Sequence, residues 1–311
     1  MNDILRIVKS IPSLTLGLLV FNQAPYIQEL LESVFNQSDK NFALLIIDNG
    51  SQDNSAKEIH ELLAQSKTAH LARFIVNTSN SGSAAGLSQL LEECDTQYLS
   101  VVHGDDILHE DYVSMVKNEI EKHPGIEAFN VALAAFSNDV GVKLGKSVYS
   151  PIWSKSKIFN RLLVSGLNPG VMPGSVLNRE FVLEKKLLNF DEKINGVEDT
   201  LLWMRIIRSG GHIQSIKRTA YRYRIHKTQF SYDDSRNSYY YGIARRHNIL
   251  EAQNWLQRTL SRAEISYELQ RFGIESRYSE GLGEDLLNTR KSFSLFRPIN
   301  SILRRIAIII S

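Results

Sequence analysis

Carboxylates stand at two places in the first half of the chain where they could do chemistry. Asp48 follows the apolar run from Phe42 to Ile47, and the pair Asp105–Asp106 comes shortly after the run from Tyr98 to Val102. Adjacent carboxylates after an apolar run repel each other. Binding of a hard divalent cation together with nucleotide phosphates commonly relieves this repulsion. A solvated turn is the alternative. We interpret these aspartates as candidates for nucleotide and metal binding.

The second half contributes a further acid pair and a basic segment. Glu198–Asp199 precedes a helical pattern, where the helix dipole alone would favour carboxylates. The alternation from Tyr221 to His226 is typical of an extended segment, which places Arg222, Arg224 and His226 on one face. Three potential cations in a line favour an anionic ligand such as a phosphate, although a solvated or lipid-facing surface would give the same pattern.

Alternating strand and helix patterns must position these residues. Buried strands are predicted at 14–21, 42–47, 72–76, 98–102 and 126–136, and helices at 25–37, after Asp53, at 83–94, 110–123 and 200–208. Strands that alternate with helices indicate an α/β fold with a doubly wound sheet and helices on both faces. In such a sheet ligands bind beyond the carboxyl ends of the strands, so the polar clusters after each strand should converge on one crevice.

Composition and missing motifs exclude several classes of protein. The 311 residues include 36 Lys and Arg, 34 Asp and Glu, 43% hydrophobic residues and a single cysteine, which indicates a globular chain without an internal disulfide. No apolar run reaches the ~18 residues of a membrane span. The Gly-x-Gly-x-x-Gly of dinucleotide-binding proteins, the phosphate-binding P-loop and the Gly-x-Ser-x-Gly of hydrolases are all absent.

The order of the motifs resembles the family-2 glycosyltransferases from about Leu14 to Ser231. The resemblance rests on Val20–Phe21–Asn22, Asp48–Asn49–Gly50–Ser51, Asn80–Ser81–Gly82, His103–Gly104–Asp105–Asp106, Glu198–Asp199 and Arg224–Ile225–His226. It implies a GT-A fold in a domain spanning 1–231, with a nucleotide-binding half at 14–125 and an acceptor half at 126–231. Residues 232–311 are expected to form a mainly helical extension.

The resemblance also implies a role for each residue. Asp199 would be the general base, paired with Glu198, and Asp105, Asp106 and His226 would hold Mn²⁺ or Mg²⁺, with Asp105 ahead of Asp106. His103 replaces the first Asp of the usual Asp-x-Asp. The donor nucleotide and sugar would contact the following residues: Phe21, Asn22, Asp48, Gly82, His103, Gly174 and Arg224.

The expected activity is transfer of one sugar, with inversion, from a nucleotide-diphosphate sugar to an acceptor hydroxyl. A UDP-sugar is the expected donor and a glycan or lipid-linked glycan the acceptor, in bacterial-type surface polysaccharide or glycolipid assembly. The Gln-x-x-Arg-Trp of processive synthases is absent, which favours addition of a single sugar. The alternatives are a catalytically silent, membrane-peripheral binding subunit and a metal-dependent nucleotidyltransferase.

The positive charge of the chain is concentrated in its last residues. After Asp285 the sequence has five Lys or Arg and no acid, and it ends in an aliphatic run. This pattern suits an anionic membrane surface, and docking on the protein itself is the alternative. We expect a cytoplasmic protein that can lie at the inner face of a membrane. Nucleic acid is not an expected partner, since the body of the chain is acidic and no recognition motif occurs.

Overall fold

A computed structural model describes residues 12–66, 72–139, 148–149, 151, 153, 170–189, 196–229, 234–251, 258 and 265. The strands are β1 (Leu14–Val20), β2 (Ala43–Asp48), β3 (Ala72–Val76), β4 (Tyr98–His103), β5 (Ile107–Leu108), β6 (Ala128–Phe136), β7 (Val148–Tyr149), β8 (Val176–Asn178) and β9 (Ile213–Arg224). The helices are α1 (Ala24–Phe35), α2 (Ser55–Gln65), α3 (Ser83–Glu93), α4 (Tyr112–Lys122), α6 (Arg179–Glu184), α7 (Glu198–Arg208) and α8 (Asp234–Leu250).

The described strands form one mixed sheet in the order β3-β2-β1-β4-β8-β6-β9-β5, with β7 paired to β6. Strands β1 to β4 are parallel. Strand β8 is antiparallel to both β4 and β6, so β6, and β9 parallel to it, run in the same direction as β4. The carboxyl ends of β1, β2, β3, β4, β6 and β9 therefore lie at one edge of the sheet.

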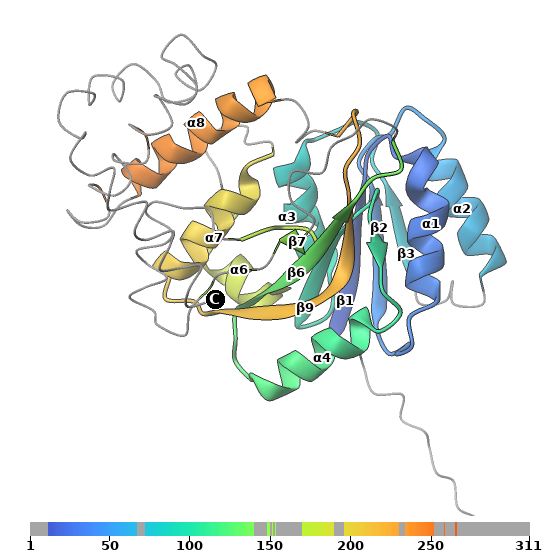
Figure 1. Cartoon of the computed structure of the whole chain (residues 1–311), viewed down its shortest axis with the longest axis horizontal. Helices are drawn as coiled ribbons and strands as arrows, with labels where there is room; N and C mark the ends of the chain where they lie inside the picture. Colours follow the sequence, from blue (N-terminus) through green and yellow to red (C-terminus); the bar gives the residue numbers. More distant parts are fainter. Residues whose placement is uncertain are drawn as a thin grey trace, which may run out of the picture.

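Helices cover both faces of the sheet because successive strand residues point to opposite sides. Leu44 and Ile46 of β2 belong to a core with α1 and α4, whereas Leu45 and Ile47 belong to a second core with α3, α6 and α7. Figure 1 shows α1 and α2 beside β1 to β3, with α6, α7 and α8 at the other side of the molecule. Two apolar cores therefore fix the sheet between two layers of helices.

Most predicted strands and helices match the observed ones to within a few residues at their ends, but β9 begins at Ile213, well before the extended segment predicted from Tyr221. Strand β3 differs from the prediction of a buried strand: it lies at the edge of the sheet, and its residues are only partly buried or exposed. The sequence also predicts a helix that begins after Asp53. Asn54 occupies the cap position of this helix. Asp53 accepts a hydrogen bond from the Ser55 N–H at 2.9 Å, and so still pairs a backbone N–H of the first turn.

The C-terminal extension is described only in part. Helix α8 packs on α7, and Glu251 pairs with Arg205 of α7 at 2.7 Å. The basic and aliphatic tail after Asp285 lies outside the described residues. Among the described residues, every helix is too short or too polar to cross a bilayer.

Candidate active site

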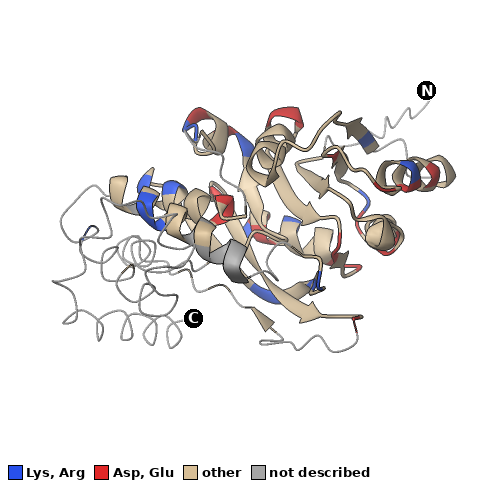
Figure 2. Cartoon of the chain, turned by 90° about the horizontal axis from the view of Figure 1, so that it is seen from above, with Lys and Arg blue, Asp and Glu red and all other residues tan. Residues whose placement is uncertain are grey.

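The polar turns that follow the parallel strands gather at the carboxyl edge of the sheet. Register pairs Val20 with Asp48 and Leu19 with His103, so β1 lies between the Asp48 loop and the His103 turn. Figure 2 looks down on this edge, and acidic segments lie near the middle of the view. The convergence predicted for the polar clusters of the first half is therefore present.

Asp48 offers a buried acceptor at the end of β2. Its side chain is fully buried, and Oδ1 accepts a hydrogen bond from the Ser51 N–H at 2.8 Å. Oδ2 is buried without a partner among the described residues. An unpaired buried carboxylate oxygen is costly unless a ligand supplies a donor. Asp48 is thus suited to accept an N–H or O–H from a bound nucleotide.

Asn22 holds the neighbouring loop. It adopts a left-handed conformation with φ 52°, its N–H donates to Ser51 Oγ at 2.9 Å, and its Oδ1 accepts from the Gln52 N–H at 2.8 Å. These bonds tie the β1–α1 turn to the loop after β2. The preceding residue, Phe21, keeps 38% of its surface exposed at the same edge. Asn22 shapes the loop, and Phe21 offers an exposed ring beside it.

Asn49 joins the loop after β2 to the loop after β3. Its Nδ2 donates to Asn80 Oδ1 and to the Gly82 carbonyl, both at 3.1 Å, and its Oδ1 accepts from Ser81 Oγ at 2.9 Å. Gly82, at φ 88°, is the N-cap of α3. Sequence reasoning missed the role of Asn49, although its place directly after Asp48 marks it.

The same loop reaches the acid pair of the second half. Ser83, the first residue of α3, accepts a hydrogen bond from the Gly196 N–H at 3.0 Å and also bonds the Glu198 carboxylate. Glu198 Oε2 is buried without a partner among the described residues. Residues that lie more than a hundred positions apart in sequence are therefore in contact at the start of α7.

Asp199 has the electrostatic character of a general base. Its Oδ1 accepts hydrogen bonds from the Thr200 N–H at 2.5 Å and from Thr200 Oγ1 at 3.2 Å. Burial, and then the negative charge of Glu198, raise the pKa of Asp199 to about 7. A carboxylate with this pKa can take up a proton near neutral pH.

The turn after β4 forms a cluster that could hold a metal ion. One ligand atom from each of His103, Asp105 and Asp106 lies within 4.8 Å of the others. Burial lowers the pKa of His103, so its imidazole is neutral at neutral pH, as a metal ligand must be. His226 Nε2 lies 3.0 Å from Asp105 Oδ2, and its Nδ1 is held by Thr228 Oγ1 at 2.8 Å. Carboxylate and imidazole donors at this separation fit a divalent cation.

The two aspartates of the cluster differ in their surroundings. Asp106 is fully buried: Oδ2 accepts from the Tyr221 hydroxyl at 2.6 Å and Oδ1 from the Arg224 N–H at 2.8 Å. Burial, followed by the charge of Asp105, raises the pKa of Asp106 well above its ordinary value. Asp105 Oδ2 meets only His226 among the described residues. Asp106 is therefore fixed in the turn by two hydrogen bonds, and Asp105 is the less constrained of the two carboxylates.

Arg224 lies beneath this turn. Its side chain is 2% exposed, Nε donates to the Asp105 carbonyl at 2.7 Å, and the guanidinium pairs with Glu29. Its Cζ also lies 4.6 Å from the centre of the Phe136 ring, which Arg222 approaches to 4.3 Å. The two arginines share one face as predicted, and the guanidinium of Arg224 is engaged by the Asp105 carbonyl and by Glu29.

Gly174 lies in a loop that meets the cluster of His103, Asp105 and Asp106 through Tyr221. It has φ 74°, and a Cβ there would lie 2.6 Å from the Tyr221 ring. The Gly174 carbonyl accepts from the Tyr112 hydroxyl at 2.7 Å, while the Tyr221 hydroxyl accepts from the His103 N–H at 3.1 Å. Tyr221 thus links the Gly174 loop to His103 and Asp106. Sequence reasoning noted its place in the aromatic and basic alternation without assigning it this role.

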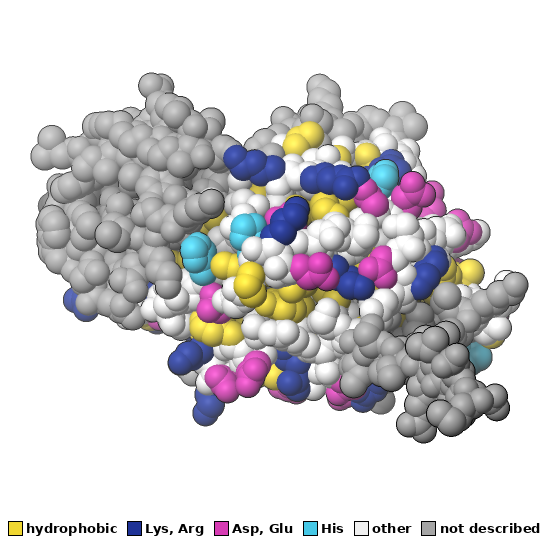
Figure 3. Space-filling model, turned by 90° about the horizontal axis from the view of Figure 1, so that it is seen from below, with side chains coloured by type: hydrophobic (Ala, Val, Ile, Leu, Met, Phe, Trp, Pro, Cys, Tyr) yellow, Lys and Arg dark blue, Asp and Glu magenta, His cyan; other side chains and the backbone are white. Residues whose placement is uncertain are grey.

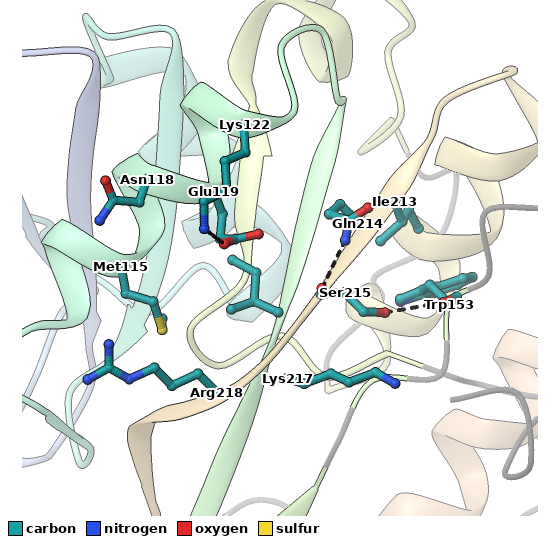
Figure 4. A pocket seen from close by; sticks show the side chains of 11 residues that line it. Met115, Asn118, Glu119, Lys122, Trp153, Ile213, Gln214, Ser215, Lys217 and Arg218 are labelled. Carbon is teal, nitrogen blue, oxygen red and sulfur yellow. Dashed lines mark hydrogen bonds and ion pairs between the residues drawn. The ribbon is translucent and has the colours of Figure 1, made fainter.

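A hollow in the described part of the chain lies away from this site. About 750 Å³ in volume, it is lined by α4, by Trp153 and by the first half of β9. Figure 4 shows Lys122, Lys217 and Arg218 around it, and Figure 3 shows the molecule from below, where apolar side chains lie among Lys and Arg. This hollow lies at the amino end of β9, whereas Arg224 at the carboxyl end meets the candidate site.

Comparisons with known proteins agree with this arrangement. The model of "Glycosyl transferase family 2" matches residues 16–185, more than half of the chain. An "Uncharacterized glycosyltransferase" of Haemophilus influenzae is 23% identical over 86% of this chain and 78% of its own length. A "Poly-beta-1,6-N-acetyl-D-glucosamine synthase" of Staphylococcus epidermidis is 22% identical, and the match covers 60% of this chain and 48% of the synthase.

Solved structures confirm the predicted GT-A type of fold. S. aureus TarS 1–349 in complex with UDP-GlcNAc superposes with a TM-score of 0.65 at 16% identity, covering 96% of this chain and 88% of TarS. The mannosyltransferase PcManGT from Pyrobaculum calidifontis, in complex with GDP-Man and Mn²⁺, gives 0.57 at 13% identity, covering 96% and 87%. The sequence match, the fold and the clustered acids together show that this chain belongs to the family-2 glycosyltransferases and is an enzyme of that class.

Proposed function

We propose that this glycosyltransferase moves one sugar from a UDP-sugar to an acceptor hydroxyl with inversion at the anomeric carbon. The acceptor oxygen attacks the anomeric carbon from the side opposite the diphosphate. The new carbon–oxygen bond forms as the bond to the diphosphate breaks, and the electron pair leaves with the nucleotide. The acceptor proton passes to the Asp199 carboxylate.

The observation that carries the proposal is the place of Asp199, beside Glu198 at the start of α7, where the chain contacts the first residue of α3; these surroundings raise its pKa to about 7. A base with this pKa matches proton uptake near neutral pH and typically contributes about 10²- to 10⁴-fold in rate. Glu198 supports it, because its charge raises the pKa of Asp199. The contacts of Ser83 keep this pair next to the loop after β3, which ends at Gly82.

The donor would bind against the loops at the carboxyl edge of the sheet. Asp48 Oδ2 accepts from the nucleobase or ribose, and the ring of Phe21 lies against the base. Asn22 and Gly82 shape these loops, and Gly174 brings backbone close to the donor sugar. The TarS complex of the same fold contains UDP-GlcNAc, which supports UDP as the nucleotide.

A divalent cation would be held by Asp105 and Asp106, with His103 in the same cluster and His226 beside Asp105. When bound, it neutralises the charge that develops on the leaving diphosphate. Arg224 does not contact the diphosphate in this scheme but holds the Asp105 carbonyl. Asp106, tied by Tyr221 and by the backbone of Arg224, keeps the turn in place.

We further propose a glycan or lipid-linked glycan as the acceptor, in assembly of a bacterial-type surface polysaccharide or glycolipid. The polysaccharide synthase among the relatives supports a role in polysaccharide assembly. The family match favours this function over that of a silent binding subunit or a nucleotidyltransferase.

Nucleotide release from a panel of donors tests the proposal. UDP-, GDP- and dTDP-sugars are incubated with the enzyme, with and without Mn²⁺, and free nucleotide is measured. We expect slow, Mn²⁺-dependent release of UDP from one UDP-sugar, because water replaces the missing acceptor. Release from no UDP-sugar at any metal concentration would contradict the proposed donor class.

A further inference from the structure

The hollow between α4 and the first half of β9 takes no part in the proposed reaction. Its volume of about 750 Å³ is in the range of small-ligand sites. Ile216, which lines it, pairs with Val131 of β6, whereas Arg224, beside the turn after β4, pairs with Phe136. About 16 Å of strand therefore separates the hollow from the candidate active site. A ligand bound in the hollow would not be the group that reacts.

An irregularity in β9 brings two adjacent basic side chains to the hollow. The pairing of β6 with β9 shifts register after Ile216, and residues 217–220 have no partner residue in β6. Successive side chains of a regular strand point to opposite faces, but Lys217 and Arg218 both line the hollow. Arg218 pairs with Asp111, whereas Lys217 is exposed and has no partner among the described residues. Lys217 is therefore a cation that a ligand can reach.

The charges around the hollow favour an anionic ligand. Its lining includes the cations Lys122, Lys217 and Arg218 and the carboxylate of Glu119, all of them from α4 and β9 (Figure 4). Glu119 pairs with Lys122 at 2.8 Å, so the positive charge of the two β9 residues is not balanced within the lining. Such a surface attracts an anion and repels a cation.

Trp153 gives the hollow a group that suits a sugar. Its side chain is 7% exposed, and the indole Nε1–H is buried without a partner among the described residues. Ser215 Oγ donates to the Trp153 carbonyl at 3.4 Å, which holds this residue against β9 (Figure 4). A buried N–H without an acceptor is costly unless a ligand supplies one, as a sugar hydroxyl can. The side-chain amides of Asn118 and Gln214 add further donors and acceptors.

The shape of the hollow distinguishes a small ligand from a membrane, which could also supply anions. An aromatic side chain that anchors a protein in a bilayer must reach the lipid from the surface. Trp153 and Met115, at 7% and 6% exposure, are recessed among their neighbours instead. Recessed apolar groups below exposed cations fit a ligand that enters the hollow with its anionic groups toward solvent.

We propose that this hollow is a secondary binding site for an acidic oligosaccharide, whose carboxylates pair with Lys217 and Arg218 and one of whose hydroxyls accepts from Trp153 Nε1. The inference rests on the proposed function in taking the oligosaccharide as part of the acceptor glycan, at a distance from the hydroxyl that reacts. The site would favour long acidic acceptors over short or neutral ones.

Calorimetric titration with two tetrasaccharides tests the proposal without any turnover. Tetragalacturonate has a carboxylate on each sugar, and maltotetraose has none. At low salt we expect the enzyme to bind tetragalacturonate about tenfold or more tightly than maltotetraose, with an affinity that falls as salt is added. Lys217→Glu should weaken tetragalacturonate binding about fivefold or more, because repulsion replaces attraction. Trp153→Phe keeps an aromatic ring and should weaken it about threefold, because one hydrogen bond is lost.

Lys57→Glu is the matched control, because it makes the same change of charge at an exposed position on α2, outside the hollow. It should leave the affinity for tetragalacturonate within about twofold. UDP binding, measured beside each titration, should be the same in all variants and shows that each is folded.

Equal affinity for the two tetrasaccharides, or unchanged tetragalacturonate binding by Lys217→Glu, would overturn the proposal. Absence of tetragalacturonate binding, together with sedimentation on phosphatidylglycerol vesicles that Lys217→Glu abolishes, would overturn it as well and assign the hollow to a membrane surface. Failure of the proposed function is separate: tetragalacturonate would still bind through Lys217 while no donor of the panel released its nucleotide.

Discussion

At the scale of single residues, the site is defined by carboxylates in contrasting environments. Asp48 keeps one buried oxygen free, Asp106 has both oxygens satisfied, and Asp199 is crowded by Glu198. Asp48 ends strand β2, Asp106 lies in the turn after β4, and Asp199 lies in the first turn of α7. Their environments suit them to the different tasks proposed for them: ligand recognition, support of the turn and uptake of a proton.

The pKa of Asp199 has a consequence for stability. Its value of about 7 lies above the ordinary 3.8, so between these values the folded protein holds a proton that the unfolded chain has lost. Folding is therefore penalised as pH rises from about 4 to 7, and the penalty is complete above pH 7. Asp199→Asn, which is neutral, should raise the free energy of unfolding at pH 8 by on the order of 1 kcal/mol or more.

Thermal unfolding at two pH values checks this. The variant should melt about 2 °C or more above the unmodified protein at pH 8, with a clearly smaller gain at pH 5, where Asp199 is protonated. Asp53→Asn is the control. Hydrogen bonds that Asp53 accepts from Ser55 and Ala24 lower its pKa, which is the opposite of the shift at Asp199. An equal gain for Asp199→Asn at both pH values would show that its carboxylate is not held at a raised pKa.

At the scale of elements, the end of β9 organises the metal turn. Tyr221 and Arg224 reach Asp105, Asp106 and His103, and Gly174 packs against the ring of Tyr221. Strand β9 pairs with β6 over most of its length, so this set of contacts is anchored in the sheet. A substitution at Gly174 should therefore change the geometry of the His103, Asp105 and Asp106 cluster.

Gly174→Ala tests that connection. Alanine at φ 74° is strained, and its Cβ would overlap the Tyr221 ring at 2.6 Å, so we expect a loss of about 2 to 4 kcal/mol in urea unfolding. Mn²⁺ binding should weaken as Tyr221 moves. Gly125→Ala is the matched control: its φ is 79° but nothing lies within 4 Å of the new Cβ, so only the backbone cost of about 1 kcal/mol is expected. Equal losses in the two variants would show that the packing on Tyr221 is unimportant.

The periodicity of the sequence was sufficient to predict most elements, because two cores impose a regular alternation on β1, β2 and β4. It could not predict that Arg224 is buried against Glu29 or that Tyr221 binds Asp106, since these contacts join residues more than a hundred positions apart. The position of β3 at the edge of the sheet could not be predicted from the sequence either, because strand order is set by packing between elements. Motif order located the site, and tertiary contacts decided the role of each side chain.

At the scale of the whole molecule, two halves of the chain meet around one edge of the sheet. The chain of contacts runs from Asn49 through the loop at Gly82 to Ser83 and Glu198, and a second runs from Gly174 through Tyr221 to Asp106. The first link holds Glu198 near the loop after β3, and the second ties Gly174 to the turn after β4. The site therefore depends on the fold of both halves.

The basic tail leads to a prediction about location. Five unopposed Lys or Arg after Asp285, each worth about 1 kcal/mol near an anionic surface, should bind vesicles that contain anionic lipids at low salt. Deletion of the residues after Asp285 should release the protein in a sedimentation assay, and a salt concentration of about 0.5 M should do the same to the full chain, because salt screens surface charge. Undiminished vesicle binding by the protein that lacks these residues would contradict the prediction and place the membrane contact elsewhere in the chain.

Proton uptake by Asp199 is the step on which the proposed mechanism depends most directly. The decisive measurement is metal-dependent UDP release by the unmodified enzyme and by Asp199→Asn, with UDP affinity measured beside it. We predict that the unmodified rate rises with pH through about 7, and that the variant loses about 10²-fold or more in rate while its UDP dissociation constant stays within about twofold. A variant that retains the rate and its pH dependence would contradict this role of Asp199.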